Sequence, residues 1–265
     1  MIVVPSPQRH SDLTMVVPTY NERDRLATLL ERIFSACERR GLAVHVVVVD
    51  DNSADGTGAL ADEWARGGRV RVIHRSGKMG LGSAVLDGFA IAQTDVVGVM
   101  DADLSHPPEL IPRLYDTLIT HELDMVVASR YVGAGNTRSW TFRRRVLSRL
   151  GCWLSRPLTP VRDAMSGFFM LRLERVSGIQ PSSQGFKIGL ELLVRALPRR
   201  VAEVSYVFVD REAGRSKMNL GECLRFLKQL VRLYVHSRVA PTSQPAYLIV
   251  SEQSSRNQST SAVGA

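Results

Sequence analysis

The sequence of 265 residues lacks any uninterrupted apolar run of the roughly 18 to 20 residues that a membrane-spanning helix requires. We therefore expect no transmembrane anchor in this chain. Its first residues, MIVVPSPQRHSD, form too short an apolar stretch for a signal peptide, and proline interrupts them. Cysteine is scarce as well. Cys37, Cys152 and Cys223 lie far apart without metal-ligand spacing, which favours a reducing compartment.

Acidic residues are missing from one long stretch. Residues 130–162 contain eight arginines and no aspartate or glutamate, and the whole chain carries a net charge of +8. Such a positive surface predicts a polyanionic partner, whether nucleic acid, an anionic membrane or a phosphorylated substrate. Nucleic-acid-binding patterns are lacking too, since no RRM, helix-turn-helix or zinc-finger motif occurs. We therefore expect a partner other than nucleic acid.

The chain alternates short apolar strands with helical segments. Strands are expected at residues 14–20, 43–51, 69–75, 95–101 and 123–131, and helices within 21–41, 51–68, 80–93 and 108–122. This alternation predicts an α/β fold with a mostly parallel sheet flanked by helices.

Polar clusters follow four of these strands. Their sequences are PTYNE, DDNSADG, DADLSH and SRY. In parallel sheets ligands bind beyond the carboxyl ends of the strands. The four clusters are therefore expected to converge on one site.

Asp101 and Asp103 are the most informative pair in these clusters. They follow an apolar strand at a spacing of two residues, and on an extended backbone their side chains would point the same way. Such carboxylates repel each other, and Mg²⁺ or Mn²⁺ would relieve the repulsion and bridge them to a phosphate. The alternative is a solvated strand end, because an Asp-x-Asp spacing alone is weakly specific.

The order of eight motifs resembles that of family 2 glycosyltransferases, and more narrowly that of dolichol-phosphate mannose synthases. The motifs are VVPTYNE, VVVVDDNSADGT, KMGLGSAVLDG, MDADLSHPPE, ASRYVGAG, SGFFMLR, GFKIGLELL and REAGRSK. The resemblance covers residues 13–236 and implies a GT-A fold, which is Rossmann-like. The chain departs from the family pattern at Ser105, where some relatives carry glutamine. It also lacks a proline that is common before SGFF.

The resemblance assigns roles to residues of this sequence. The residues expected to bind the nucleotide sugar are Pro18, Tyr20, Glu22, Asp50, Asp51, Lys78 and Asp101. Those expected to bind the acceptor phosphate are Arg130, Arg144, Ser216 and Lys217. The metal ligands would be Asp101 and Asp103, and the catalytic residues Asp101, Asp103, Arg130 and Arg211.

The implied reaction explains why these residue types are needed. A metal and basic side chains neutralise the diphosphate as it leaves the sugar. The acceptor in this family is a lipid phosphate, which is largely a dianion near neutral pH and has little need of a general base. Arginine suits such a group, because it can contact a phosphate through two N–H donors. His106 is expected to be a loop or supporting residue, and Glu191 to be structural.

Two stretches predict contact with a membrane surface. In residues 140–158 one apolar stripe, composed of Val146, Leu147, Leu150, Trp153 and Leu154, is flanked by arginines. Residues 219–238 repeat the pattern with Leu220, Leu224, Leu227, Val231 and Tyr234. Basic amphipathic helices of this kind lie on anionic lipid. For the second stretch, packing on the protein core is an equal alternative because its apolar face is wide.

The leading hypothesis is therefore inverting transfer of mannose from GDP-mannose to dolichyl or polyprenyl phosphate. Alternatives are a UDP-glucose-dependent polyprenyl-phosphate glucosyltransferase and a non-catalytic subunit that binds a nucleotide sugar and the membrane. We expect an N-terminal extension at 1–11, a GT-A domain at 12–238 and a disordered tail at 239–265. The expected location is the cytosolic face of a membrane, bound peripherally or through a small membrane-anchoring subunit.

Overall fold

The computed structural model describes residues 12–133, 135, 142–176, 179, 187–208, 220–239 and 245–250, without the side chains of residues 143, 220, 222 and 223. The strands are β1 (Leu13–Thr19), β2 (Val44–Asp50), β3 (Val70–His74), β4 (Val96–Val99), β5 (Met125–Ser129), β6 (Phe169–Arg172), β7 (Arg200–Ser205) and β8 (Ala246–Val250). The α-helices are α1 (Arg23–Glu38), α2 (Thr57–Ala65), α3 (Leu81–Ala90), α4 (Ile111–Thr120), α5 (Phe142–Ser155), α6 (Ile188–Arg195) and α7 (Leu220–Val239). Short 3₁₀ turns occupy Pro108–Leu110 and Leu173–Val176.

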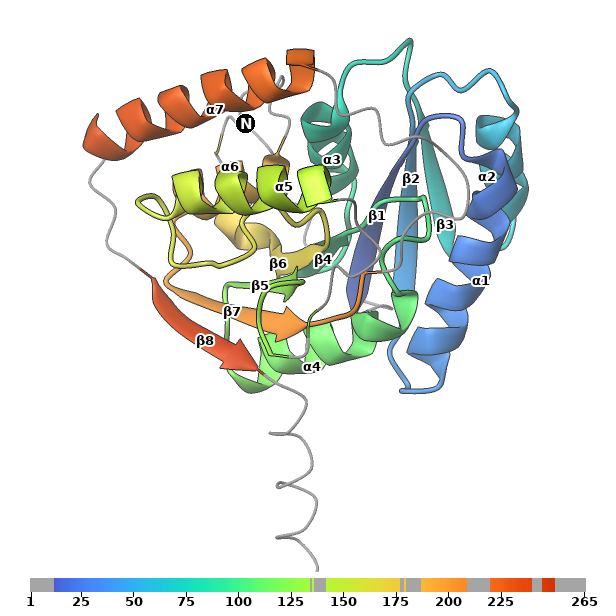
Figure 1. The fold of residues 1–265 in the computed structure, drawn as a ribbon. Coiled ribbons are helices and arrows are strands. Elements are labelled where there is room, and N and C mark those ends of the chain that lie inside the picture. Colours follow the sequence, from blue (N-terminus) through green and yellow to red (C-terminus); the bar gives the residue numbers. More distant parts are fainter. Residues whose placement is uncertain are drawn as a thin grey trace, which may run out of the picture.

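The strands form one sheet at the centre of the molecule (Figure 1). Their order is β3-β2-β1-β4-β6-β5-β7-β8, and β6 runs antiparallel to its neighbours β4 and β5. The five strands expected from the sequence are confirmed as β1 to β5. The α/β class and the mostly parallel sheet are confirmed as well, whereas the antiparallel β6 was not anticipated.

Helices cover both faces of the sheet because their apolar stripes need partners. On one face α1 and α4 bury residues such as Leu30 and Leu114 against β1 and β4. On the other face α3 and α6 pack against the same sheet through residues such as Phe89 and Leu192. Gly88 allows α3 to approach closely, since a Cβ there would lie 2.4 Å from a methyl carbon of Val16.

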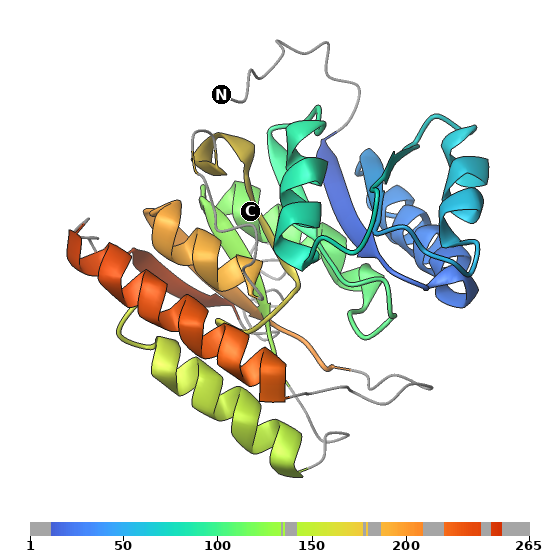
Figure 2. The same ribbon diagram turned by 90° about the horizontal axis from the view of Figure 1, so that it is seen from above.

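Helices α5 and α7 form a further layer beyond α6, where they lie side by side (Figure 2). A small apolar cluster joins this layer to the rest of the protein, with Leu190 from α6 and Phe226, Leu230 and Leu233 from α7. The Tyr234 hydroxyl of α7 donates a hydrogen bond to the Leu154 carbonyl of α5 at 2.6 Å. None of the described helices is long and apolar enough to cross a lipid bilayer.

The expected disordered tail at 239–265 is wrong for one segment, because Ala246–Val250 forms the edge strand β8. It pairs in parallel with β7, with Val201 opposite Tyr247 and Val204 opposite Val250. Tyr247 packs against the apolar core on one face of the sheet and Val250 against the core on the other. The surrounding Ser- and Gln-rich composition hid this short apolar run.

Candidate active site

The carboxyl ends of the first strands lie at one edge of the sheet, and β4 ends earlier there than β1. Thr19 of β1 pairs with Asp50 of β2, and Asp50 pairs with His74 of β3. On the other side of β1, Val16 pairs with Val99, the last residue of β4. The polar clusters that follow β1, β2 and β4 therefore start at the same edge, as the sequence predicted.

Asp50 is buried at this edge and holds the turn that follows β2. Its carboxylate accepts hydrogen bonds from the Thr19 hydroxyl at 3.1 Å and from the Ser53 backbone N–H at 3.0 Å. The Ser53 hydroxyl donates to the same carboxylate at 2.5 Å. These contacts give Asp50 a structural task beside any contact with a nucleotide.

Asp51 contacts Arg75, a residue that the sequence analysis missed. Arg75 is buried, and its Nη1 lies 2.5 Å from Asp51 Oδ1. Its Nη2 donates to the Ser83 hydroxyl at 2.5 Å, and its Nη1 also donates to the Gly80 carbonyl at 3.2 Å. Arg75 thereby ties the end of β2 to the start of α3. Its place directly after β3 was the one available signal in the sequence.

Tyr20 and Lys78 contact each other at the protein surface, beyond the ends of β1 and β3. Tyr20 is exposed, and Lys78 Nζ lies 4.1 Å from the centre of its ring, within the range of a cation–π contact. The Glu22 backbone N–H donates to the Thr57 hydroxyl at 2.9 Å, while its carboxylate pairs with Arg25 at 2.9 Å. Pro18 lies within β1, opposite Val49. All the predicted nucleotide residues thus lie on or just beyond the ends of β1 to β4.

Asp101 and Asp103 lie in a turn, because β4 ends at Val99. The expectation that an extended backbone aligns their side chains is therefore wrong. The Asp101 side chain is 37% exposed, whereas Asp103 is buried and accepts the Ser105 backbone N–H at 3.0 Å. A Cβ at Gly167 would lie 3.2 Å from Asp101 Oδ2, so this glycine leaves space beside the carboxylate.

The donor set fits a hard divalent cation that shares its ligands with a substrate. Carboxylate oxygens suit Mg²⁺ and Mn²⁺, which commonly use one or two carboxylates together with phosphate oxygens. Within the described part of the chain, no group of three or more His, Cys, Asp or Glu residues could hold a metal by itself. A bound diphosphate would supply further oxygens to a cation held by Asp101 and Asp103.

His106 supports the acidic turn from inside the protein. Its Nδ1 accepts the Asp101 backbone N–H at 3.3 Å, and its ring stacks on Phe168 with 5.3 Å between the centres. The edges of Tyr206 and Phe208 also contact the ring. Burial lowers the pKa of His106 below its ordinary value, although Asp101 acts in the opposite direction. The structure thus gives His106 the supporting place that the sequence predicted.

Arg130 forms an ion pair with Asp163, a second residue that was not predicted from the sequence. Arg130 Nε and Nη2 donate to the two Asp163 oxygens at 2.8 and 2.7 Å, and the Arg130 backbone N–H donates at 2.8 Å. Burial alone would lower the pKa of Arg130, but the Asp163 carboxylate outweighs it and holds that pKa above its ordinary value. Asp163 is the first acidic residue after the acid-free stretch at 130–162.

Phe208 links the two described arginines of the predicted acceptor site. The Arg130 guanidinium carbon lies 5.7 Å from the centre of its ring and the Arg144 guanidinium carbon 5.4 Å. Because Phe208 also contacts His106, a continuous path of contacts joins Asp101 to both arginines. The other predicted residues of this half, Arg211, Ser216 and Lys217, lie outside the described residues.

Lys187 is a further basic residue near the acidic turn. Burial lowers its pKa, and the Asp101 and Asp163 carboxylates act against that change. The Gln229 side chain of α7 holds the backbone of Lys187, accepting its N–H and donating to its carbonyl, both at 3.1 Å.

The Gln229 amide also donates to Glu191 at 3.2 Å, and Glu191 pairs with Arg195. Glu191 thus has the structural contacts expected of it.

Comparisons with known proteins identify the family of this chain. The family described as Glycosyl transferase family 2 matches residues 14–178. A dolichol-phosphate mannosyltransferase of Pyrococcus furiosus is 40% identical over 225 residues, which cover 83% of this chain and 63% of that protein. A protein of the same name from Saccharomyces cerevisiae is 40% identical over 235 residues, covering 84% of this chain and 87% of that protein.

Solved structures support the fold. A mannosyltransferase from Pyrobaculum calidifontis, solved in complex with GDP-Man and Mn²⁺, superposes with a TM-score of 0.59. The superposition covers 92% of this chain and 68% of that one, at 20% sequence identity. At this identity the likeness establishes the GT-A fold. The family match and the relatives 40% identical over most of the chain show that this chain belongs to glycosyl transferase family 2 and, within it, to the dolichol-phosphate mannosyltransferases.

Proposed function

We propose that the protein transfers mannose from GDP-mannose to the phosphate of a dolichyl or polyprenyl lipid, with inversion at the sugar carbon. One observation carries this proposal. The Asp101–Asp103 turn and the arginines Arg130 and Arg144 are joined through His106 and Phe208 into one site. An acidic turn suited to a metal diphosphate thus lies beside a basic pair suited to a second phosphate.

The donor half would hold the nucleotide diphosphate. Asp101 and Asp103 would hold Mg²⁺ or Mn²⁺, and such a cation would supply positive charge to the leaving diphosphate. Tyr20 offers an exposed ring for the base, and Lys78 above it offers a positive charge. The buried Arg75 keeps the end of β2 in place beside this surface.

The acceptor half needs to orient a dianion rather than remove a proton. A phosphate monoester is largely doubly charged near neutral pH, so its oxygen can attack without a general base. Arg130 and Arg144 would position that oxygen, and two of the Arg130 donors are already fixed by Asp163. A single in-line displacement on an α-linked donor then yields a β-linked lipid phosphate.

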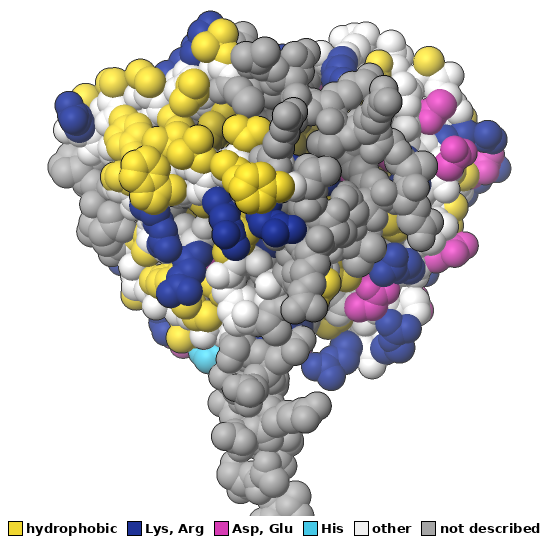
Figure 3. All heavy atoms as spheres, viewed as in Figure 1, with side chains coloured by type: hydrophobic (Ala, Val, Ile, Leu, Met, Phe, Trp, Pro, Cys, Tyr) yellow, Lys and Arg dark blue, Asp and Glu magenta, His cyan; other side chains and the backbone are white. Residues whose placement is uncertain are grey.

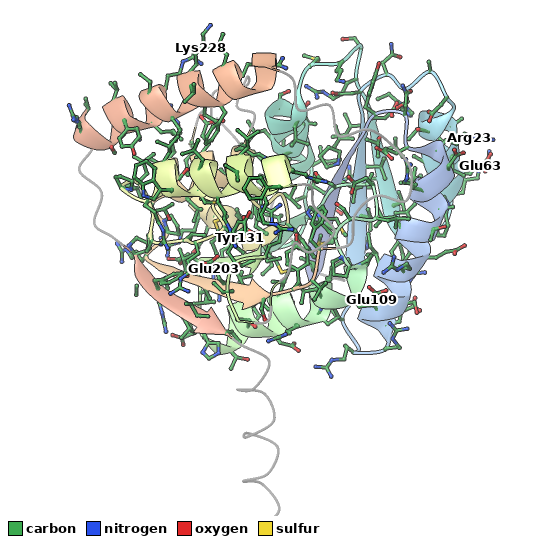
Figure 4. All side chains as sticks on the ribbon, in the orientation of Figure 1. Arg23, Glu63, Glu109, Tyr131, Glu203 and Lys228 are labelled. Atoms are coloured by element: carbon green, nitrogen blue, oxygen red, sulfur yellow. The ribbon has the colours of Figure 1, made fainter. Side chains whose placement is uncertain are left out.

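The lipid would reach the site along a surface formed by α5 and α7, here called the α5–α7 surface. Its exposed apolar residues are Phe142, Val146, Leu147, Leu150, Trp153, Leu224, Leu227, Val231, Val235 and Val239. Figure 3 shows this apolar area with Lys and Arg side chains along its border. Lys228 points outward from α7 (Figure 4). Such a combination suits the interface of an anionic membrane.

Helix α7 packs one face on the protein core, and its other face is free to take part in the proposed membrane contact. Phe226 and Leu230 are buried in the apolar cluster with α6, while Leu227 and Val231 are exposed. We propose peripheral binding at the cytosolic face of a membrane. A small membrane-anchoring subunit would bring the site to the lipid plane through its transmembrane helices. We propose that it binds at the same α5–α7 surface.

Replacing Trp153 with serine is expected to weaken binding to anionic vesicles about tenfold, because an indole buries a large apolar area on entering lipid. Trp153 is 69% exposed on the α5–α7 surface. Co-sedimentation with phosphatidylglycerol vesicles measures the effect. Ile119→Ser is the matched control, since Ile119 is exposed at 40% on α4, outside this surface. Equal loss of binding in both variants would contradict membrane docking through α5 and α7.

The donor sugar is tested with purified protein, a short polyprenyl phosphate, Mn²⁺ or Mg²⁺, and labelled GDP-mannose or UDP-glucose in separate reactions. We expect metal-dependent transfer of label to the organic phase from GDP-mannose only. Transfer from UDP-glucose alone would keep the mechanism but reject the proposed donor. Absence of transfer from either donor, also with vesicles present, would reject the proposal for this chain by itself.

A further inference from the structure

Glu203 is a fully buried carboxylate that the proposed transfer does not use. It lies on β7, and its side chain has no exposed surface. A buried charge is costly unless hydrogen bonds satisfy it. The hydrogen-bond partners of Glu203 therefore indicate the structural role of this buried carboxylate.

Two of these contacts hold the loop that carries Asp163. Glu203 Oε1 accepts the Asp163 backbone N–H at 2.9 Å, and Oε2 accepts the Arg162 backbone N–H at 2.7 Å. The carboxylate thus clamps two consecutive peptide groups. Because Asp163 in turn binds Arg130 through both its oxygens, Glu203 fixes the position of Arg130 through one intermediate residue.

The clamp has a third partner from the C-terminal part of the chain. The Tyr247 hydroxyl of β8 donates a hydrogen bond to Glu203 Oε2. Strand β8 pairs with β7 in parallel, with Tyr247 opposite Val201, so Tyr247 reaches Glu203 diagonally along the same face of the sheet. Figure 4 marks Glu203 together with Tyr131, the residue that follows Arg130. A path of hydrogen bonds therefore runs from the edge strand to the predicted acceptor site.

We infer that Glu203 and Tyr247 are positioning residues that set the orientation of Arg130 toward the phosphate of the acceptor lipid, so that β8 completes the acceptor half of the site. The inference rests on the proposed function only where it names the lipid phosphate. The geometric part, from Tyr247 to Arg130, stands on the contacts themselves.

Tyr247 is the gentler position for a test, because phenylalanine keeps the ring and removes only the hydroxyl. Without that donor, Oε2 of Glu203 loses one of its hydrogen bonds inside the protein, and the clamp on Arg162 and Asp163 loosens. Glu203→Gln is the stronger change, since the amide nitrogen cannot accept a backbone N–H. Tyr115→Phe on α4 is the matched control, because it removes a phenol hydroxyl outside this path.

The first readout needs no transfer activity. The Arg130 Nε–H, buried and bonded to Asp163, should give a slowly exchanging ¹⁵N–¹H signal, which is assigned by its loss in Arg130→Lys. We expect this signal to shift and to exchange faster with solvent in Tyr247→Phe and in Glu203→Gln, and to stay unchanged in Tyr115→Phe. A lower melting temperature with an unmoved Arg130 signal in both test variants would overturn the inference, because the residues would then only stabilise the fold.

The second readout is kinetic. In Tyr247→Phe we expect KM for polyprenyl phosphate to rise about tenfold, the usual scale for loss of one hydrogen bond to a buried charge, while KM for GDP-mannose stays the same. An equal rise in both KM values would overturn the positioning role. A wild-type protein without transfer activity would refute the proposed function, and the Arg130 signal would still decide whether the path from Tyr247 exists.

Discussion

Exchanging Asp101 for asparagine is expected to lower the rate of mannosyl transfer by about 10³-fold at saturating Mn²⁺, since loss of one charge that stabilises the leaving group has this scale. Asparagine keeps the shape of the side chain and removes its negative charge. The Asp101 backbone contact with His106 does not depend on the side chain and should persist. The rate is measured as label transferred from GDP-mannose to polyprenyl phosphate.

Asp116→Asn provides the control for this change. Asp116 is an exposed residue of α4 that pairs with Arg40 at 3.3 Å, away from the strand ends. We expect it to leave the rate unchanged, and we expect EDTA to abolish transfer in the unmodified protein. An Asp101→Asn variant with more than about a tenth of the wild-type rate would contradict the assignment of Asp101 to the metal, because metal stabilisation amounts to several kcal/mol.

The predictable part of this protein is the part encoded by neighbouring residues. Apolar runs such as 44–50 specify buried strands, and a polar cluster after each strand specifies an edge where ligands bind. The Asp101–Asp103 turn could be found from the sequence for this reason. Its backbone conformation could not, because nothing in the sequence fixes where β4 ends.

The residues that sequence reasoning missed depend on contacts between distant segments. Asp163 lies 33 positions from Arg130, and Tyr247 lies 44 positions from Glu203. Their pairing is decided by the order of strands in the sheet, where β6 inserts between β4 and β5 and β8 joins β7. A single sequence contains no signal for such insertions. The acid-free stretch at 130–162 indicated that its arginines need acidic partners from elsewhere in the chain, but it did not indicate which acidic residue pairs with Arg130.

A transferase that joins two phosphorylated molecules needs separate places for two anions. The donor diphosphate needs a cation between it and the acidic turn, while the acceptor phosphate needs fixed arginines. Phe208 contacts both halves of the site: His106 lies edge-on to its ring at 6.0 Å between centres, and both arginines lie within cation–π range of it. Arg130 can serve an anionic substrate only if its own orientation is maintained between turnovers, which makes its partner Asp163 important.

Replacing Asp163 with asparagine is expected to lower the free energy of unfolding by about 3 to 5 kcal/mol, the usual cost of removing one partner from a buried ion pair. Asp163 has no exposed surface, and Arg130 is also buried. The guanidinium would then keep its positive charge inside the protein without the carboxylate that compensates it. Urea unfolding followed by circular dichroism measures the change.

Asp116→Asn is the matched control here too, because the exposed Arg40–Asp116 pair should contribute less than about 0.5 kcal/mol.

The double variant Arg130→Met, Asp163→Asn separates the effect of the Arg130 charge from the effect of its packing. If the cost of Asp163→Asn arises from the uncompensated charge of Arg130, removing that charge should restore part of the lost stability. A double variant less stable than Asp163→Asn alone would show instead that Arg130 stabilises the protein by its packing on Phe208 and Tyr131. The arginine would then be fixed by its aromatic neighbours, and Asp163 would matter chiefly through the backbone N–H of Arg130 that it accepts.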